Sequence, residues 1–209
     1  MAARQIEVIK NTKDKQLTYS RMLGRYKAAV SKEFYLEALL IDYAMIEDRL
    51  RSFIYYCGGI SNRSAKKFNV KQGVDAKVRN IIEEYGRSGD DNRLTITTIY
   101  GKIKIVRSLL SWAATTDEKP VDSYLKALKS DLEKVDIGGL LDTLDEIELW
   151  RKYRDEVIHG VLNKNMDSLD ESLSAKVSEG MEYARFLDGE VKVLKRGNKT
   201  RKVLKLQNN

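Results

Sequence analysis

The chain's only histidine, His159, lies in the stretch LWRKYRDEVIHGVLNKN, at residues 149–165. Arg154 precedes it by five positions and Asp155 by four. Helical residues four apart share a face, so Asp155 is placed to orient the imidazole, whereas Arg154 is offset from it by roughly 140°. The long guanidinium can still swing toward His159, especially if the helix loosens at Gly160. The stretch therefore predicts an arginine, a carboxylate and an imidazole around one pocket near a helix end.

This set of groups suits the cleavage of RNA. An imidazole with a pKa of about 6.5 can take the proton of a ribose 2′-OH, and a guanidinium can stabilise charge at the phosphate. Arg151 lies one turn before Asp155, and Glu47 of an upstream helix is placed to hold Arg154, so we expect both to have supporting roles. The chemistry needs no metal ion or cofactor, and neither is expected.

The same residues also fit a structural interpretation. Asp155 and His159 would then be an ordinary surface pair worth about 0.2–0.5 kcal/mol. Arg154 borders the apolar line of its helix and would serve as an ion-pair partner of Glu47 or Asp48, because a charge there is costly to desolvate alone.

Basic residues are concentrated at the end of the chain. The net charge is +7, and residues 189–209 hold seven Lys or Arg and one Glu, so nearly all of the excess lies there. Basic surfaces attract polyanions, above all nucleic acid, although a solubilising charged end is the alternative. The RNA-binding candidates in this tail and in a second cluster are Arg63, Lys66, Lys67, Lys192, Lys195, Arg196, Lys199, Arg201 and Lys202.

Composition limits the class of protein. Apolar residues make up 42% of the chain, enough for a packed core. The single cysteine, Cys57, excludes an internal disulfide and a Cys-based zinc site. No uninterrupted apolar run approaches about 18 residues, and residues 1–16 lack the apolar run of a signal peptide, so we expect a cytoplasmic protein that does not bind membranes.

Apolar spacing predicts a helical fold. Seven residues spaced alternately three and four apart form one stripe that ends before Gly58: Leu36, Leu39, Tyr43, Ile46, Leu50, Phe53 and Cys57. Similar patterns predict further helices within 74–85, 99–113, 122–132, 140–159 and 168–187, and a partly helical N-terminus. In the tail, alternating apolar residues around Gly197-Asn198 predict a short β-hairpin.

These elements predict an all-α fold, an up-and-down bundle of five to seven helices. We expect three parts: a partly helical N-terminal segment at 1–30, the helical domain at 31–188 and the basic tail at 189–209.

The stretch RDEVIH, from Arg154 to His159, matches the R-x(4–6)-H motif of the HEPN superfamily, in which a polar residue directly follows the arginine. Its surroundings, LWRKYRDEVIHG, and the upstream helix YAMIEDRLRSF also resemble members of this superfamily. The chain looks like an abortive-infection protein of the AbiF-like kind, related to the nuclease domains of RNA-guided type VI CRISPR effectors. The resemblance covers residues 31–187.

The resemblance implies a metal-independent endoribonuclease. The same resemblance implies that Arg154 and His159 are catalytic and that Asp155 supports them. In such families two motif copies face each other, and because this chain has one copy, a homodimer is expected. Relatives act in phage defence or as toxins with an antitoxin, and some are partnered by a structured non-coding RNA.

Two other functions fit the residues. A non-catalytic RNA-binding bundle would bind RNA through the tail in a salt-sensitive way and would keep that binding without His159. A helical protein-interaction module would use its apolar stripes for a partner and would carry no RNA when purified.

Overall fold

The computed structural model describes residues 12–60, 74–87, 96–116, 120–163 and 165–206. Across these residues the chain is helical and contains no strand, which confirms the predicted all-α class. The helices in chain order are α1 (Thr12–Ser31), α2 (Tyr35–Tyr56), α3 (Val74–Tyr85), α4 (Ile99–Thr115), α5 (Ser123–Leu132), α6 (Ile137–Gly160), the short 3-10 helix η1 (Val161–Asn163), α7 (Met166–Lys195) and α8 (Lys199–Val203).

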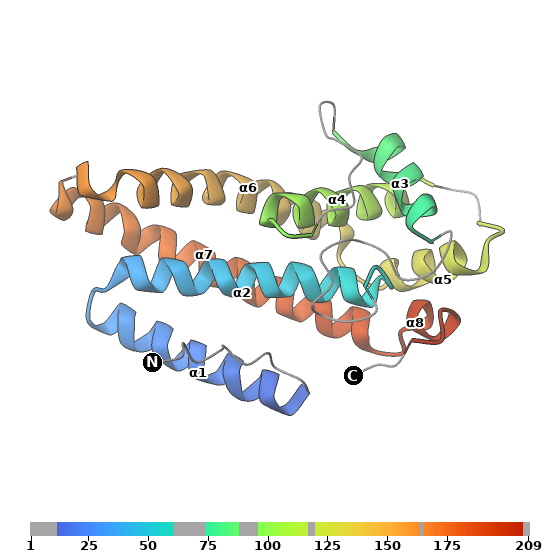
Figure 1. The fold of residues 1–209 in the computed structure, drawn as a ribbon, viewed down its shortest axis with the longest axis horizontal. Helices are drawn as coiled ribbons and strands as arrows, with labels where there is room; N and C mark the ends of the chain where they lie inside the picture. The colour runs from blue at the N-terminus through green and yellow to red at the C-terminus, as the bar shows by residue number, and fades with distance from the viewer. Residues whose placement is uncertain (1–11, 61–73, 88–95, 117–119, 164, 207–209) are drawn as a thin grey trace, which may run out of the picture.

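The centre of the bundle is formed by α2 and α7, which run side by side in the same direction (Figure 1). Their register is fixed where Asp42 packs beside Gly180 and where the Arg49 guanidinium donates to Asp188 at 2.7 Å. α1 folds back along α2, and α6 runs antiparallel to α7 (Figure 1). The outer helices therefore cover the central pair in an up-and-down arrangement.

The apolar stripes predicted from the sequence form the core. Burying one large apolar side chain contributes about 1.5–3 kcal/mol, so these stripes account for much of the stability. No described helix combines the length and apolar character that crossing a membrane requires. The stripe residues of α2, α6 and α7 with at most 1% exposed surface are Leu39, Ile46, Leu50, Phe53, Leu140, Leu144, Ile147, Trp150, Val157, Leu173, Val177, Ala184, Leu187 and Leu194.

A glycine lets the three central helices approach closely. Gly180 of α7 lies where Trp150 of α6 meets Asp42 of α2, and a Cβ there would come within 2.7 Å of the Trp150 ring. The buried indole donates its N–H to the Lys176 carbonyl at 2.7 Å. Helix α6, whose last two turns carry the predicted catalytic residues, is thereby fixed against α7.

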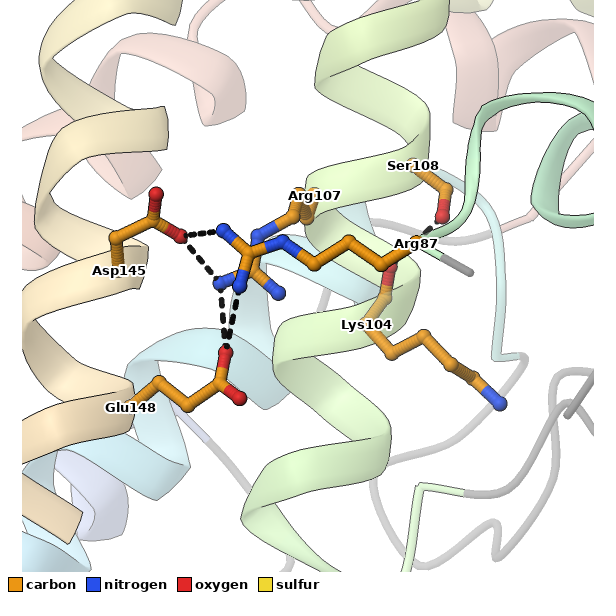
Figure 2. A network of polar contacts seen from close by, with 6 residues as sticks. All are labelled: Arg87, Lys104, Arg107, Ser108, Asp145 and Glu148. Carbon is orange, nitrogen blue, oxygen red and sulfur yellow. Dashed lines mark hydrogen bonds and ion pairs between the residues drawn. The ribbon is translucent and has the colours of Figure 1, made fainter. Parts of the chain in front are cut away.

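Polar contacts fix the other side of α6 (Figure 2). Asp145 and Glu148 of α6 each accept hydrogen bonds from two arginines: Arg107 of α4, and Arg87, which follows α3. The Arg107 Nη2 atom lies 2.7 Å from Asp145 and 3.0 Å from Glu148. Two guanidiniums and two carboxylates neutralise each other and join α4 to the middle of α6.

The predicted β-hairpin in the tail is wrong. Helix α7 continues through residue 189 to Lys195, and α8 follows after a turn at Gly197, where φ is +61°. Val191 and Leu194 continue the three-and-four spacing of the α7 stripe, so they face the core from a helix. The alternating pattern was too short to separate a strand from the end of a helix.

The tail is anchored by its own polar groups. Asn198 caps α8, because its side-chain oxygen accepts the Arg201 N–H at 2.9 Å. The buried carboxylate of Asp131 in α5 accepts the N–H groups of Lys199 and Thr200 at 2.8 and 2.7 Å. Residues 198–204 are therefore packed against the bundle through specific contacts.

Candidate active site

The predicted catalytic residues occupy the last two turns of α6, and Asp155 is the centre of their contacts. Its Oδ1 atom accepts a hydrogen bond from Arg154 Nη1 at 2.6 Å, and its Oδ2 atom accepts one from Arg151 Nη1 at 2.8 Å. One carboxylate thus holds two guanidiniums in defined positions. Arg151, expected to have a supporting role, is a direct part of this cluster.

Arg154 lies flat against an aromatic ring. Its guanidinium carbon is 3.6 Å from the centre of the Tyr43 ring of α2, and its side chain is 14% exposed. This cation–π contact places the charge between α2 and α6 without an ion-pair partner on α2. Burial raises the pKa of Tyr43, and Arg154 opposes that rise. Arg154 is consequently fixed by a ring on one side and by Asp155 on the other.

An open pocket of about 510 Å³ adjoins this cluster. It lies between α2, the start of α4 and α6, and Arg151 and Asp155 form part of its wall. The Arg151 guanidinium carbon is 5.9 Å from the centre of the Tyr100 ring at the same wall. The charged side chains that an anionic group would meet in the pocket are Arg151 and the Asp155 carboxylate that binds it. The residues that line the pocket are Tyr43, Thr98, Ile99, Tyr100, Arg151 and Asp155.

His159 is exposed in the last turn of α6. Within the described part of the chain, no hydrogen bond or ion pair holds its ring, and the expected contact with Asp155 is replaced by the two arginine bonds. Arg154 lies against Tyr43 and does not turn toward His159. Because positions five apart are offset by roughly 140° on a helix, a single chain does not bring the two groups together.

Glu47 does not contact Arg154. Its carboxylate accepts a hydrogen bond from Lys102 Nζ of α4 at 2.7 Å, and Lys102 is fully buried. Burial lowers the pKa of Lys102, and Glu47 opposes that shift. Asp48, the other predicted partner of Arg154, pairs with Lys15 and Arg49. Glu47 therefore binds a lysine of α4 and not the predicted catalytic arginine of α6.

The basic residues of the tail divide into exposed and buried groups. Arg201 is 1% exposed, and its guanidinium donates to the carbonyls of Tyr55 and Ile60 at 3.0 and 3.1 Å. It also lies 3.6 Å from the centre of the Tyr55 ring. This placement removes Arg201 from the predicted RNA-binding surface. Five of the candidates are exposed, namely Lys192, Lys195, Arg196, Lys199 and Lys202.

The second predicted RNA-binding cluster, Arg63, Lys66 and Lys67, lies outside the described residues. Among the described residues, no group of three or more His, Cys, Asp or Glu side chains is arranged to hold a metal ion.

Two tyrosines of the site were missed by the sequence reasoning. Tyr43 belongs to the apolar stripe of α2 and was assigned to the core, but its ring face carries Arg154. Tyr100 lies in the first turn of α4, where nothing in the local sequence signals a site. Both are recognised only when α2, α4 and α6 are placed together.

Comparison with family models, with curated proteins and with solved structures finds no match to this chain.

Proposed function

We propose that this protein is a metal-independent endoribonuclease of the HEPN kind that acts as a homodimer. The observation that carries this function is the end of α6, where the chain's only imidazole is exposed within two turns of a fixed Arg151–Asp155–Arg154 cluster. Few other side chains can exchange a proton near neutral pH, and few bind a phosphate as firmly as a guanidinium.

The roles follow from the chemistry of each group. His159 takes the proton of the ribose 2′-OH, whose oxygen attacks the phosphorus; the bond from phosphorus to the 5′-oxygen of the next nucleotide breaks, and that oxygen takes a proton from water. The exposed ring of His159 is accessible to a large substrate. The guanidinium of Arg154 stabilises the charge that develops on the phosphate. Asp155 acts through the arginines, because both of its oxygens are bound by them, and Arg151 extends the positive charge toward the open pocket.

A second copy of the chain is needed because Arg154 and His159 face different sides of α6. A two-fold axis beside the end of α6 would bring the His159 of each subunit opposite the arginines of its partner. The phosphate would then lie between groups that come from two chains. The resemblance to the HEPN superfamily supports the same arrangement.

The resemblance also suggests the biological setting. The enzyme would act on RNA in phage defence or as the toxin of a toxin–antitoxin pair, with an antitoxin or a structured non-coding RNA as partner. These roles rest on the RDEVIH motif and its surroundings.

The first test is RNA cleavage by the purified protein in EDTA. We expect His159→Ala to lower the cleavage rate about 10²–10⁴-fold, because general acid–base catalysis contributes that much. Lys152→Ala is the matched control, since this exposed residue of α6 is not one of the donors that bind Asp155 and should leave the rate unchanged. Equal cleavage by His159→Ala and the wild type would reject the assignment.

The second test addresses the shared site. Arg154→Lys keeps the charge but loses the planar fork, so we expect it to cleave RNA at least about tenfold more slowly. Mixing Arg154→Lys with His159→Ala should restore part of the activity, because one site of each mixed dimer then has both intact groups. If the mixture is no more active than its components, the two groups do not act across a subunit boundary.

The second candidate function is RNA binding without cleavage, which is favoured by the five predicted RNA-binding cations that are exposed near the C-terminus. Such a protein would bind RNA with an affinity that falls steeply with salt, and the wild type would leave the RNA intact. His159→Ala would then have no effect on either property.

A further inference from the structure

A cavity of about 430 Å³ lies between α1, the C-terminal half of α2 and the C-terminal end of α7. It is separate from the pocket beside the candidate active site, because the two share no lining residue: α1, α2 and α7 line this cavity, whereas the other pocket is lined from α2, the start of α4 and α6. Figure 1 shows α1, which lines this cavity, and α4, which lines the other pocket, on opposite sides of α2. The proposed nuclease activity makes no use of it.

Positive charge predominates in the cavity. Four cations line it, Lys15, Arg49, Lys192 and Lys195, against one lining carboxylate, Asp188. Asp48 lies beside the cavity and pairs with Lys15 and Arg49, so cations still outnumber these carboxylates by four to two. An anion in the cavity would therefore be attracted.

The inner cations are held in place before any ligand binds. The Arg49 guanidinium bonds to Asp48 and Asp188, each at 2.7 Å, and is 12% exposed. Lys15 Nζ lies 2.6 Å from Asp48 and 3.2 Å from the Ser52 hydroxyl. Because these contacts already fix the two side chains, less conformational entropy is lost when a ligand binds them.

Other walls of the cavity are apolar and aromatic. Tyr19, Leu23, Tyr56 and Val191 line it, and the Tyr19 ring lies 4.3 Å from the Arg49 guanidinium. Burial raises the pKa of Tyr19 to about 12, so its phenol remains a hydrogen-bond donor at neutral pH. The volume falls in the range of about 300–1,000 Å³ that is usual for small-molecule sites.

From this combination we infer that the cavity binds a nucleoside monophosphate, with the phosphate among Lys15, Arg49, Lys192 and Lys195 and the base against the tyrosine-lined wall. The ligand class follows from the chemistry of the walls. The phosphate group would pair with the cations, and the flat base would pack against the apolar and aromatic side chains of the cavity.

The test is isothermal titration of the full chain with AMP, GMP, CMP and UMP, with adenosine and inorganic phosphate as comparison probes. Lys192→Ala/Lys195→Ala removes the two exposed cations at the cavity without touching the core. Lys27→Ala/Lys126→Ala is the matched control, because it removes the same charge from exposed positions that do not line the cavity.

We expect at least one monophosphate to bind the wild type and the control equally. Its Kd should rise about tenfold or more in Lys192→Ala/Lys195→Ala, because each phosphate contact is charge-assisted. Adenosine should bind at least about tenfold more weakly than AMP if AMP is the ligand that binds.

Three results would overturn the inference: no binding of any monophosphate, equal binding by the cavity variant and the control, or binding of an RNA oligonucleotide that the cavity variant loses while no monophosphate binds. His159→Ala should bind the nucleotide like the wild type. The outcome for this cavity is therefore independent of the outcome for RNA cleavage.

Discussion

Asp42 has surroundings that differ sharply from those of a free side chain. It has no exposed surface, and within the described residues neither of its carboxyl oxygens has a hydrogen-bond partner. Burial raises its pKa from 3.8 to about 8, and the nearby Arg185 opposes this shift only in part. The carboxyl group is therefore neutral in the folded protein at pH 7, whereas it is ionised in the unfolded chain.

This difference makes the stability depend on pH. A raised pKa in the folded state means that the unfolded state binds fewer protons between pH 4 and 8, so Asp42 lowers the free energy of unfolding as pH rises through this window. We expect Asp42→Asn to remove that dependence. Its stability relative to the wild type should increase by up to about 1.4 kcal/mol per pH unit between pH 5 and 8. Urea unfolding at several pH values measures this, and parallel pH profiles for the two proteins would contradict it.

At the scale of elements, the two glycines of α7 differ in how closely other helices pack against them. Gly180 faces Trp150 and Asp42 closely, whereas Gly189, nine residues further along the same helix, has open space within 4 Å of the point where a Cβ would lie. The two glycines share a helix and a residue type but differ in their surroundings, so they separate the effect of packing from the effect of helix propensity.

We expect Gly180→Ala to destabilise the protein by about 1–3 kcal/mol, because the new methyl group must displace the Trp150 ring or the α2 backbone. Gly189→Ala should instead stabilise it by about 0.5–1 kcal/mol, because alanine loses less conformational entropy in a helix. Thermal unfolding followed by circular dichroism checks both. Similar shifts of the same sign in the two variants would show that helix contacts at Gly180 do not limit packing.

The start of α6 differs from the sequence expectation for a related reason. The apolar pattern predicted this helix within 140–159, yet α6 begins at Ile137 and includes Gly138 and Gly139. Asp136 makes this start possible, because its carboxylate accepts the Gly139 N–H at 3.0 Å. A capping side chain thus outweighs the low helix propensity of two glycines.

At the scale of the whole molecule, the C-terminal tail belongs to the folded body. Arg201 bonds to two carbonyls at the end of α2 and just beyond it, and Gly58 leaves room for Leu204, which a Cβ at that position would meet at 2.5 Å. α8 also packs against α5 through Asp131. The last helix therefore closes the end of the bundle that lies opposite the predicted catalytic residues (Figure 1).

We expect Arg201→Ala to destabilise the fold by about 2–3 kcal/mol, because it removes the buried, charge-assisted hydrogen bonds to the carbonyls of Tyr55 and Ile60. Lys202→Ala, at the exposed neighbouring position, should change the stability by no more than about 0.5 kcal/mol. Denaturant unfolding of the two variants measures the difference. Equal stabilities would mean that the tail is not part of the cooperative unit.

The sequence by itself determined the helical class, most helix positions and the stripes that form the core, because these depend on local spacing of apolar side chains. It also placed Arg154, Asp155 and His159 on one helix near its end. The roles of these residues in catalysis stay a prediction that the cleavage experiments address.

Only the tertiary structure decided what the charged side chains contact. Asp155 binds two arginines and does not bind His159. The Arg154 guanidinium packs on the Tyr43 ring, and Glu47 binds Lys102. Arg201 is buried. The physical reason is that a long charged side chain takes the nearest carboxylate, carbonyl or ring face when it leaves water, and that neighbour usually comes from a distant part of the chain.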